Sequence, residues 1–70
     1  MNTTILKREI AYELTEVQNI TRMYLADIDG HIARRNFRSA HFATAKLTEI
    51  WTSSEMRIQD LRAAAAVVGA

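Results

Sequence analysis

The residues best suited to chemistry in this 70-residue chain form a short basic cluster near its middle. Within eleven residues, and with no carboxylate among them, the sequence holds His31, Arg34, Arg35, Arg38 and His41. Guanidinium groups bind phosphate and carboxylate through paired hydrogen bonds, so Arg34, Arg35 and Arg38 are candidates for binding an anion or a nucleic acid. A simpler role for Arg34 and Arg35 is to offset the negative end of a helix, whereas Arg38 would lie at a helix start, where a cation is unfavourable.

The composition favours a nucleic-acid partner less than a protein partner. Nine Lys and Arg residues against eight Asp and Glu residues give a formal net charge of +1. Near the basic cluster, the aromatic side chains that could stack on bases are limited to Phe37 and Phe42. A nucleic-acid-binding domain typically carries a strongly basic face, which this balance of charges does not indicate.

Three side chains of this region have the chemistry of metal ligands. Asp27 and His31 are four residues apart, on one face of a helix, and a fold in the chain would bring His41 near them. Their spacing is not that of a known ligand motif, and the chain has no cysteine. A pair between the side chains of Asp27 and His31, four residues apart on one helix, is the simpler interpretation. We therefore predict neither a metal nor a cofactor.

No arrangement typical of catalysis stands out in the sequence. The run of hydroxyl residues Thr52, Ser53 and Ser54 has no histidine positioned near it, and no glycine-rich phosphate loop is present. A chain this short, if built from two helices, encloses no pocket that would exclude water from a reaction. The sequence therefore predicts a protein that is not an enzyme.

The elements that carry these residues are indicated by the spacing of apolar side chains. In the second half of the chain, two positions of a heptad recur without a slip, which predicts a helix over residues 37–68 that packs along another helix. One position holds Phe37, Thr44, Trp51, Ile58 and Ala65, and the other holds Ala40, Leu47, Ser54, Leu61 and Val68.

A similar pattern predicts a first helix over about residues 3–34. Its core positions are Ile10, Leu14, Val17, Thr21, Tyr24, Ile28 and His31, with Leu6 and Ile20 beside them. Asn2, Thr3 and Thr4 are candidate N-caps because each side chain offers an oxygen to unpaired backbone amides.

The turn between these helices has two candidate positions. Gly30 would suit the residue that closes a helix, whereas a turn at Arg34-Arg35-Asn36 makes Asn36 the N-cap and gives two helices of equal length. We favour the second position, which makes the numbers of paired residues add up to about 72. Thr21 then faces Trp51, whose indole N–H requires an acceptor. The predicted fold class is all-α, with residues 1–70 forming a single antiparallel two-helix hairpin.

One segment allows a different fold. Thr52-Ser53-Ser54-Glu55 matches the capping-box pattern, in which a hydroxyl residue is followed three positions later by a carboxylate. It would start a third helix after a break near Thr52 and produce a three-helix bundle. The heptad pattern crosses this segment without a shift, so we favour one continuous helix.

Several apolar side chains lie outside the predicted core positions, and a hairpin with one line of contact buries little surface. We expect these side chains to bind a partner: Met23, Leu25, Ile32, Phe42, Ile50 and Met56. The simplest partner is a second copy in a two-fold dimer, a four-helix bundle, and the other is an unidentified protein. The sequence thus predicts a small non-enzymatic interaction protein, such as a regulator, inhibitor or adaptor. The alternatives are a nucleic-acid-binding regulator and a structural subunit of a larger assembly.

The cellular location predicted from the sequence is the cytoplasm. The longest apolar run, from Ala63 to Val68, is far shorter than the roughly 20 residues that span a bilayer. We therefore expect no helix that crosses a membrane and no membrane partner. The first charged residues follow the first apolar ones, which is not the order of a secretory signal.

Overall fold

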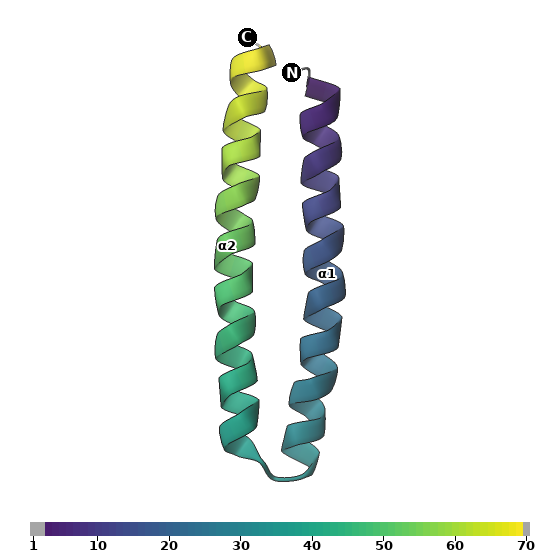
Figure 1. The fold of residues 1–70 in the computed structure, drawn as a ribbon, viewed down its shortest axis with the longest axis vertical. Helices are drawn as coiled ribbons and strands as arrows, with labels where there is room; N and C mark the ends of the chain where they lie inside the picture. The colour runs from purple at the N-terminus through teal and green to yellow at the C-terminus, as the bar shows by residue number, and fades with distance from the viewer. Residues whose placement is uncertain (1–2, 70) are drawn as a thin grey trace.

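The computed structural model describes residues 3–69, which form two long helices joined by a short turn (Figure 1). Helix α1 spans Thr3–Ala33 and helix α2 spans Phe37–Gly69. The helices lie antiparallel and side by side, with backbone dimensions of 53 × 15 × 11 Å (Figure 1). This arrangement confirms the all-helical hairpin and places all four helix ends within one residue of the predicted bounds. Of the candidate N-caps, Asn2 lies outside the described residues.

The turn at Arg34-Arg35-Asn36 is confirmed, and Gly30 lies inside α1. The Arg35 amide donates to the Ile32 carbonyl at 2.9 Å, and the Asn36 amide donates to the His31 carbonyl at 2.8 Å. This pair of bonds is a Schellman motif, which satisfies the last carbonyls of a helix. Asn36 also begins α2, because its side-chain Oδ1 accepts a hydrogen bond from the Ser39 amide at 3.4 Å.

The left-handed position of this turn is occupied by Arg35, with a φ of 58°. A residue with a Cβ is strained in this conformation, and glycine is not. We expect Arg35→Gly to raise the free energy of unfolding by about 0.5 kcal/mol, measured by thermal denaturation at a fixed protein concentration. Arg34→Gly is the matched control and should lower stability, because Arg34 does not have a positive φ. Equal effects of the two substitutions would contradict this explanation.

Helix α2 passes through Thr52 without a break, so the three-helix alternative is wrong. The Thr52 hydroxyl donates to the Thr48 carbonyl at 3.0 Å, one turn earlier in the same helix. Thr44 and Thr48 make the same kind of bond to Ala40 and Thr44. A threonine hydroxyl bonded in this way is not available to cap a new helix.

The predicted pairing of the two helices is confirmed near the middle of the hairpin and at its open end. The Trp51 indole Nε1–H donates to the Thr21 hydroxyl at 2.9 Å, which is the predicted partner. At the open end Gly69 lies beside Thr3, where a Cβ added to the glycine would be 3.8 Å from Thr3 Cγ2. The register deduced by folding the chain at the turn therefore holds along the hairpin.

The line of contact between the helices differs in part from the predicted core positions. Of the two predicted rows in α2, the one with Ala40, Leu47 and Ser54 is buried, whereas Phe37, Thr44 and Trp51 of the other are exposed. Ala43 and Ile50, one residue earlier in sequence than Thr44 and Trp51, lie at the contact instead. The small side chains of Ala40 and Ala43 let the helix backbones approach closely, and bulky rings do not fit between them.

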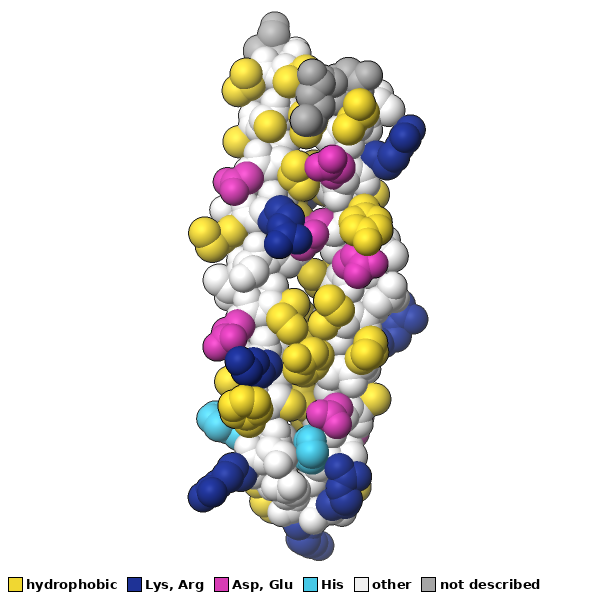
Figure 2. All heavy atoms as spheres, viewed as in Figure 1, with side chains coloured by type: hydrophobic (Ala, Val, Ile, Leu, Met, Phe, Trp, Pro, Cys, Tyr) yellow, Lys and Arg dark blue, Asp and Glu magenta, His cyan; other side chains and the backbone are white. Residues whose placement is uncertain are grey.

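On α1 the same shift exposes Leu14, which is 44% accessible, and draws Glu13 to the contact in its place. Hydrophobic side chains form a strip between the two helices (Figure 2). Among residues 3–69, the buried hydrophobic core consists of Leu6, Ala40, Ala43 and Leu47. Neither helix, over the part of the chain that the structure describes, contains an apolar stretch long enough to cross a membrane.

Candidate functional site

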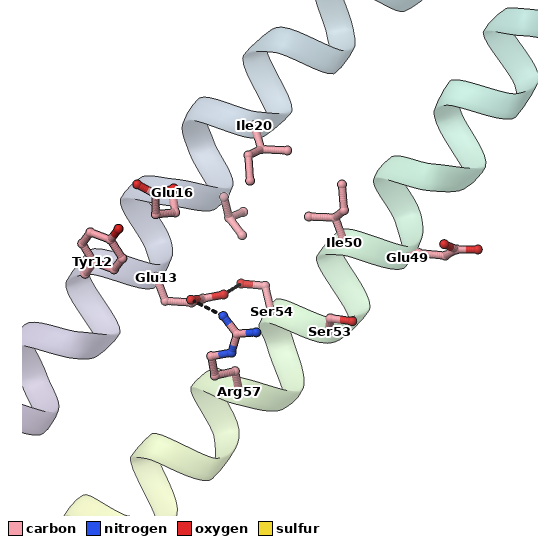
Figure 3. Close-up of a pocket in the computed structure, with 10 residues that line it drawn as sticks. Tyr12, Glu13, Glu16, Ile20, Glu49, Ile50, Ser53, Ser54 and Arg57 are labelled. Carbon is pink, nitrogen blue, oxygen red and sulfur yellow. Dashed lines mark hydrogen bonds and ion pairs between the residues drawn. The ribbon is translucent and has the colours of Figure 1, made fainter.

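A cluster of three polar side chains connects the helices at the middle of the hairpin (Figure 3). Glu13 of α1 accepts a hydrogen bond from the Ser54 hydroxyl at 2.8 Å through one carboxylate oxygen. Its other oxygen accepts a bond from Arg57 Nη1 at 2.9 Å. The Glu13 side chain is 12% exposed and Ser54 is buried, whereas Arg57 reaches in from solvent.

The hydrogen bond from Ser54 is the main reason why the pKa of Glu13 lies below its ordinary value of 4.5. The nearby Arg57 guanidinium lowers this pKa further, and partial burial opposes both effects. The carboxylate is therefore a weak base, and Ser54, the hydroxyl residue that donates to it, is buried. The cluster is suited to holding the helices in register and not to proton transfer or nucleophilic attack.

An open groove of about 470 Å³ lies beside this cluster. Ile20 and Ile50 point toward each other across it, and Glu16, Glu49 and Ser53 lie around it (Figure 3). Ile50 was expected to lie outside the core positions, and the structure corrects this placement, because Ile50 is half-buried at the contact between the helices. The cause is the same shift in the line of contact that exposes Trp51. That Ile50 binds a partner stays a prediction.

Glu13 was also missed from the sequence alone, and no role in the contact between the helices was assigned to it. The signal that could have found it is the polar residue Ser54 at a core position of the facing helix. A hydroxyl in a line of apolar residues requires a hydrogen-bond partner when it is buried. The candidates for that partner are polar residues of α1 at the same level.

Basic side chains gather at the turn end of the hairpin (Figure 2). Arg34, Arg35 and Arg38 are all exposed there. The predicted pair of Asp27 and His31 is confirmed, with 3.3 Å between Asp27 Oδ2 and His31 Nε2. Arg34 Nη2 lies 3.3 Å from the other ring nitrogen of His31 and donates to it, since a guanidinium group cannot accept.

The neighbours of His31 bear on metal binding. Both of its ring nitrogens are engaged, one by Asp27 and one by Arg34, so neither presents a free lone pair to an ion. Within residues 3–69, no three His, Asp or Glu side chains are grouped closely enough to hold a metal. Asp27, His31 and Arg34 thus contact one another at the C-terminal end of α1.

The other residues expected to bind a partner are exposed but lie on more than one side of the hairpin. They are Met23, Leu25, Ile32, Phe42 and Met56, with exposed fractions from 48% to 72%. Phe42 has a polar neighbour in Lys46, whose Nζ lies 5.6 Å from the centre of its ring. The expected set is therefore divided by the fold and does not form one surface.

One side of the hairpin collects apolar residues from both helices, and we call it the heptad face. Its residues are Leu14, Thr21, Leu25 and Ile32 of α1, and Phe37, Thr44 and Trp51 of α2. Steps of seven and four residues keep each row on one side of its helix. The hydrogen bond from Trp51 to Thr21 shows that the two rows lie on the same side of the hairpin.

The apolar members of the heptad face are well exposed. Phe37 is 60% accessible, and the exposed fractions of Leu14, Leu25, Ile32 and Trp51 lie between 44% and 48%. The face thus combines Leu25 and Ile32, which were expected to bind a partner, with residues that were predicted to lie in the hairpin core. The large ones among the latter are Leu14, Phe37 and Trp51. No protein-family model, curated protein or solved structure matches this chain, so the chemistry of its surface is the basis for assigning a role.

Proposed function

We propose that this chain is a non-enzymatic protein-interaction module whose hairpin completes its hydrophobic core by associating with a partner. The observation that carries the proposal is the large surface of the hairpin, which exposes 5443 Å² for a mass of 8.0 kDa. A compact protein of this mass exposes about 4,500 Å². The excess of about 1,000 Å² is similar to what one partner buries in a protein–protein interface of standard size.

The exposed side chains are of the kind that protein interfaces bury. Large hydrophobic residues at least 43% accessible occur along both helices, and they include two phenylalanines and the only tryptophan. Aromatic side chains and methionine are enriched at the centres of interfaces. An exposed apolar surface of this extent is uncommon on a protein that remains monomeric.

The thin core of the hairpin supports the same proposal. Leu6 and Leu47 are its only large buried side chains among residues 3–69, and the other buried hydrophobic residues are alanines. Ordering each residue costs on the order of 1.5 kcal/mol, and so small a core offsets little of that cost. Association adds buried surface without ordering a longer chain.

A dilution experiment tests this proposal. Helix content and thermal midpoint are measured by circular dichroism from about 0.1 to 100 µM, with the mass followed by light scattering. We expect helicity and midpoint to depend on association, so that the monomeric chain is poorly helical or melts at a lower temperature. A monomer that stays fully helical and melts cooperatively at one temperature across the whole range would contradict the proposal.

A further inference from the structure

We infer that the heptad face is covered by a second copy of the same chain, related by a two-fold axis, with the two turns pointing in opposite directions. This inference rests on the proposed function and deepens it by naming the partner and the surface. Two hairpins joined in this way form a four-helix bundle in which each helix has two neighbours. A two-fold axis requires only one self-complementary surface, which a single gene product provides.

The spacing of the face indicates a helical partner. Rows repeating every seven residues present side chains at the intervals that another helix lying alongside can fill. Thr21 and Thr44 are small residues between the larger Leu14, Leu25, Phe37 and Trp51. Alternation of large and small side chains lets the side chains of two such surfaces interdigitate. Both rows of the heptad face are free of charged residues.

The size of the surface fits a dimer. The hairpin exposes about 1,000 Å² more than a compact protein of 8.0 kDa. In a standard interface each partner buries about 800 Å², so one additional hairpin per chain accounts for most of the excess. A much larger assembly is not needed to cover it.

The charge of the turn decides the orientation. Arg34, Arg35 and Arg38 are exposed at one end of the hairpin. If both turns lay at the same end of the dimer, six guanidinium groups would gather there and repel one another. A two-fold axis perpendicular to the long axis separates the two turns, which then lie at opposite ends of the region where the two copies overlap. The uncharged face begins beside the turn and extends to Leu14, so the two turn halves overlap.

The outer side of α2 is a weaker candidate for the same role. Phe42 and Met56 are exposed there, but Lys46 and Glu49 lie between them in the sequence and are exposed as well. The Lys46 ammonium lies over the Phe42 ring, so that ring already has a polar neighbour. Single hydrophobic residues among charges are common on solvent-facing surfaces.

Matched substitutions on the full chain test the inference. Phe37→Glu alters the heptad face and Phe42→Glu alters the outer side, although both rings are similarly exposed, at 60% and 65%. Glutamate suits both positions, the first near a helix N-terminus and the second four residues before Lys46. Leu25→Glu and Met23→Glu form a second pair on α1. The dissociation constant is measured by light scattering on dilution, and the emission of Trp51 reports its burial.

We expect the unmodified chain to dimerise, with Trp51 emission shifting to longer wavelength on dissociation. Phe37→Glu and Leu25→Glu should weaken the dimer at least about tenfold, and Phe42→Glu and Met23→Glu should change its dissociation constant by less than about threefold. The opposite ranking would overturn the inference.

Ala33→Cys tests the orientation, because a disulfide between the turns of two copies would form readily only if both turns lay at one end.

The experiment also separates this inference from the proposed function. A wild-type chain that remains monomeric and poorly helical would exclude the second copy, while the requirement for a different partner would still hold. A monomer that remains stable and fully helical would exclude both. A dimer in which all four glutamate variants dissociate alike would overturn the assignment of the heptad face.

Discussion

Replacing Leu47 with alanine is expected to lower the free energy of unfolding by about 3 kcal/mol. Leu47 is 2% exposed and is one of two large side chains in the buried core of residues 3–69. Truncation removes its contacts and leaves a cavity, because two long helices cannot move together at one point without losing contact elsewhere. A small domain has little stability to lose, so much of the helicity should disappear at moderate temperature.

The measurement is urea denaturation followed by circular dichroism, with wild type and variant at the same concentration. Met56→Ala is the matched control, since Met56 is 61% exposed and its truncation should change stability by no more than about 0.5 kcal/mol. A loss for Leu47→Ala no larger than that of the control would show that the two helices do not pack through this residue.

Replacing Glu13 with leucine is expected to raise the free energy of unfolding by about 1–2 kcal/mol. The Glu13 side chain is 12% exposed at the contact between the helices, and the exchange of a charged group withdrawn from water in this way for a well-packed apolar side chain is often stabilising. A leucine there would lie beside Val17 and Ile50 in the groove. The Ser54 hydroxyl would turn to a carbonyl of its own helix, as Thr44, Thr48 and Thr52 already do.

Ser54→Ala is the informative companion and should act in the opposite direction. It removes the hydroxyl that donates to Glu13 at 2.8 Å and leaves the carboxylate in place with one donor fewer. We expect a loss of about 1–2 kcal/mol, because an unsatisfied group costs more than a formed bond contributes. If both substitutions destabilise the hairpin equally, the polar cluster contributes net stability and the argument from burial is wrong.

The same cluster predicts a dependence on pH. The pKa of Glu13 in the folded chain lies below its ordinary value of 4.5, so folding favours the carboxylate form. The stability from this shift is fully present above about pH 4.5 and is lost as the pH falls below that value, through the lowered pKa. The difference in thermal midpoint between wild type and Glu13→Leu, measured from pH 7 to pH 3, should therefore widen on acidification. A difference that stays constant would contradict the lowered pKa.

The amino-acid sequence by itself determined the fold class, the turn and the register. Apolar residues at steps of three and four specify a helix regardless of what it packs against, and Asn36 with the basic residues before it specifies where one helix ends and the next begins. Once the turn is known, two straight helices have one antiparallel pairing. The contact between Thr21 and Trp51 could therefore be deduced.

Only the tertiary structure decided which apolar residues the hairpin itself uses. The apolar stripe of α2 is wider than one line of contact, and its heptad pattern does not say which edge faces α1. Close packing at Ala40 and Ala43 turns that edge toward α1, which brings Ile50 and Glu13 to the contact between the helices and leaves Phe37 and Trp51 exposed. The spacing of apolar residues shows which side of a helix packs. The size of the facing side chains decides whether a residue on that side is covered by the other helix of the hairpin or left for a separate partner.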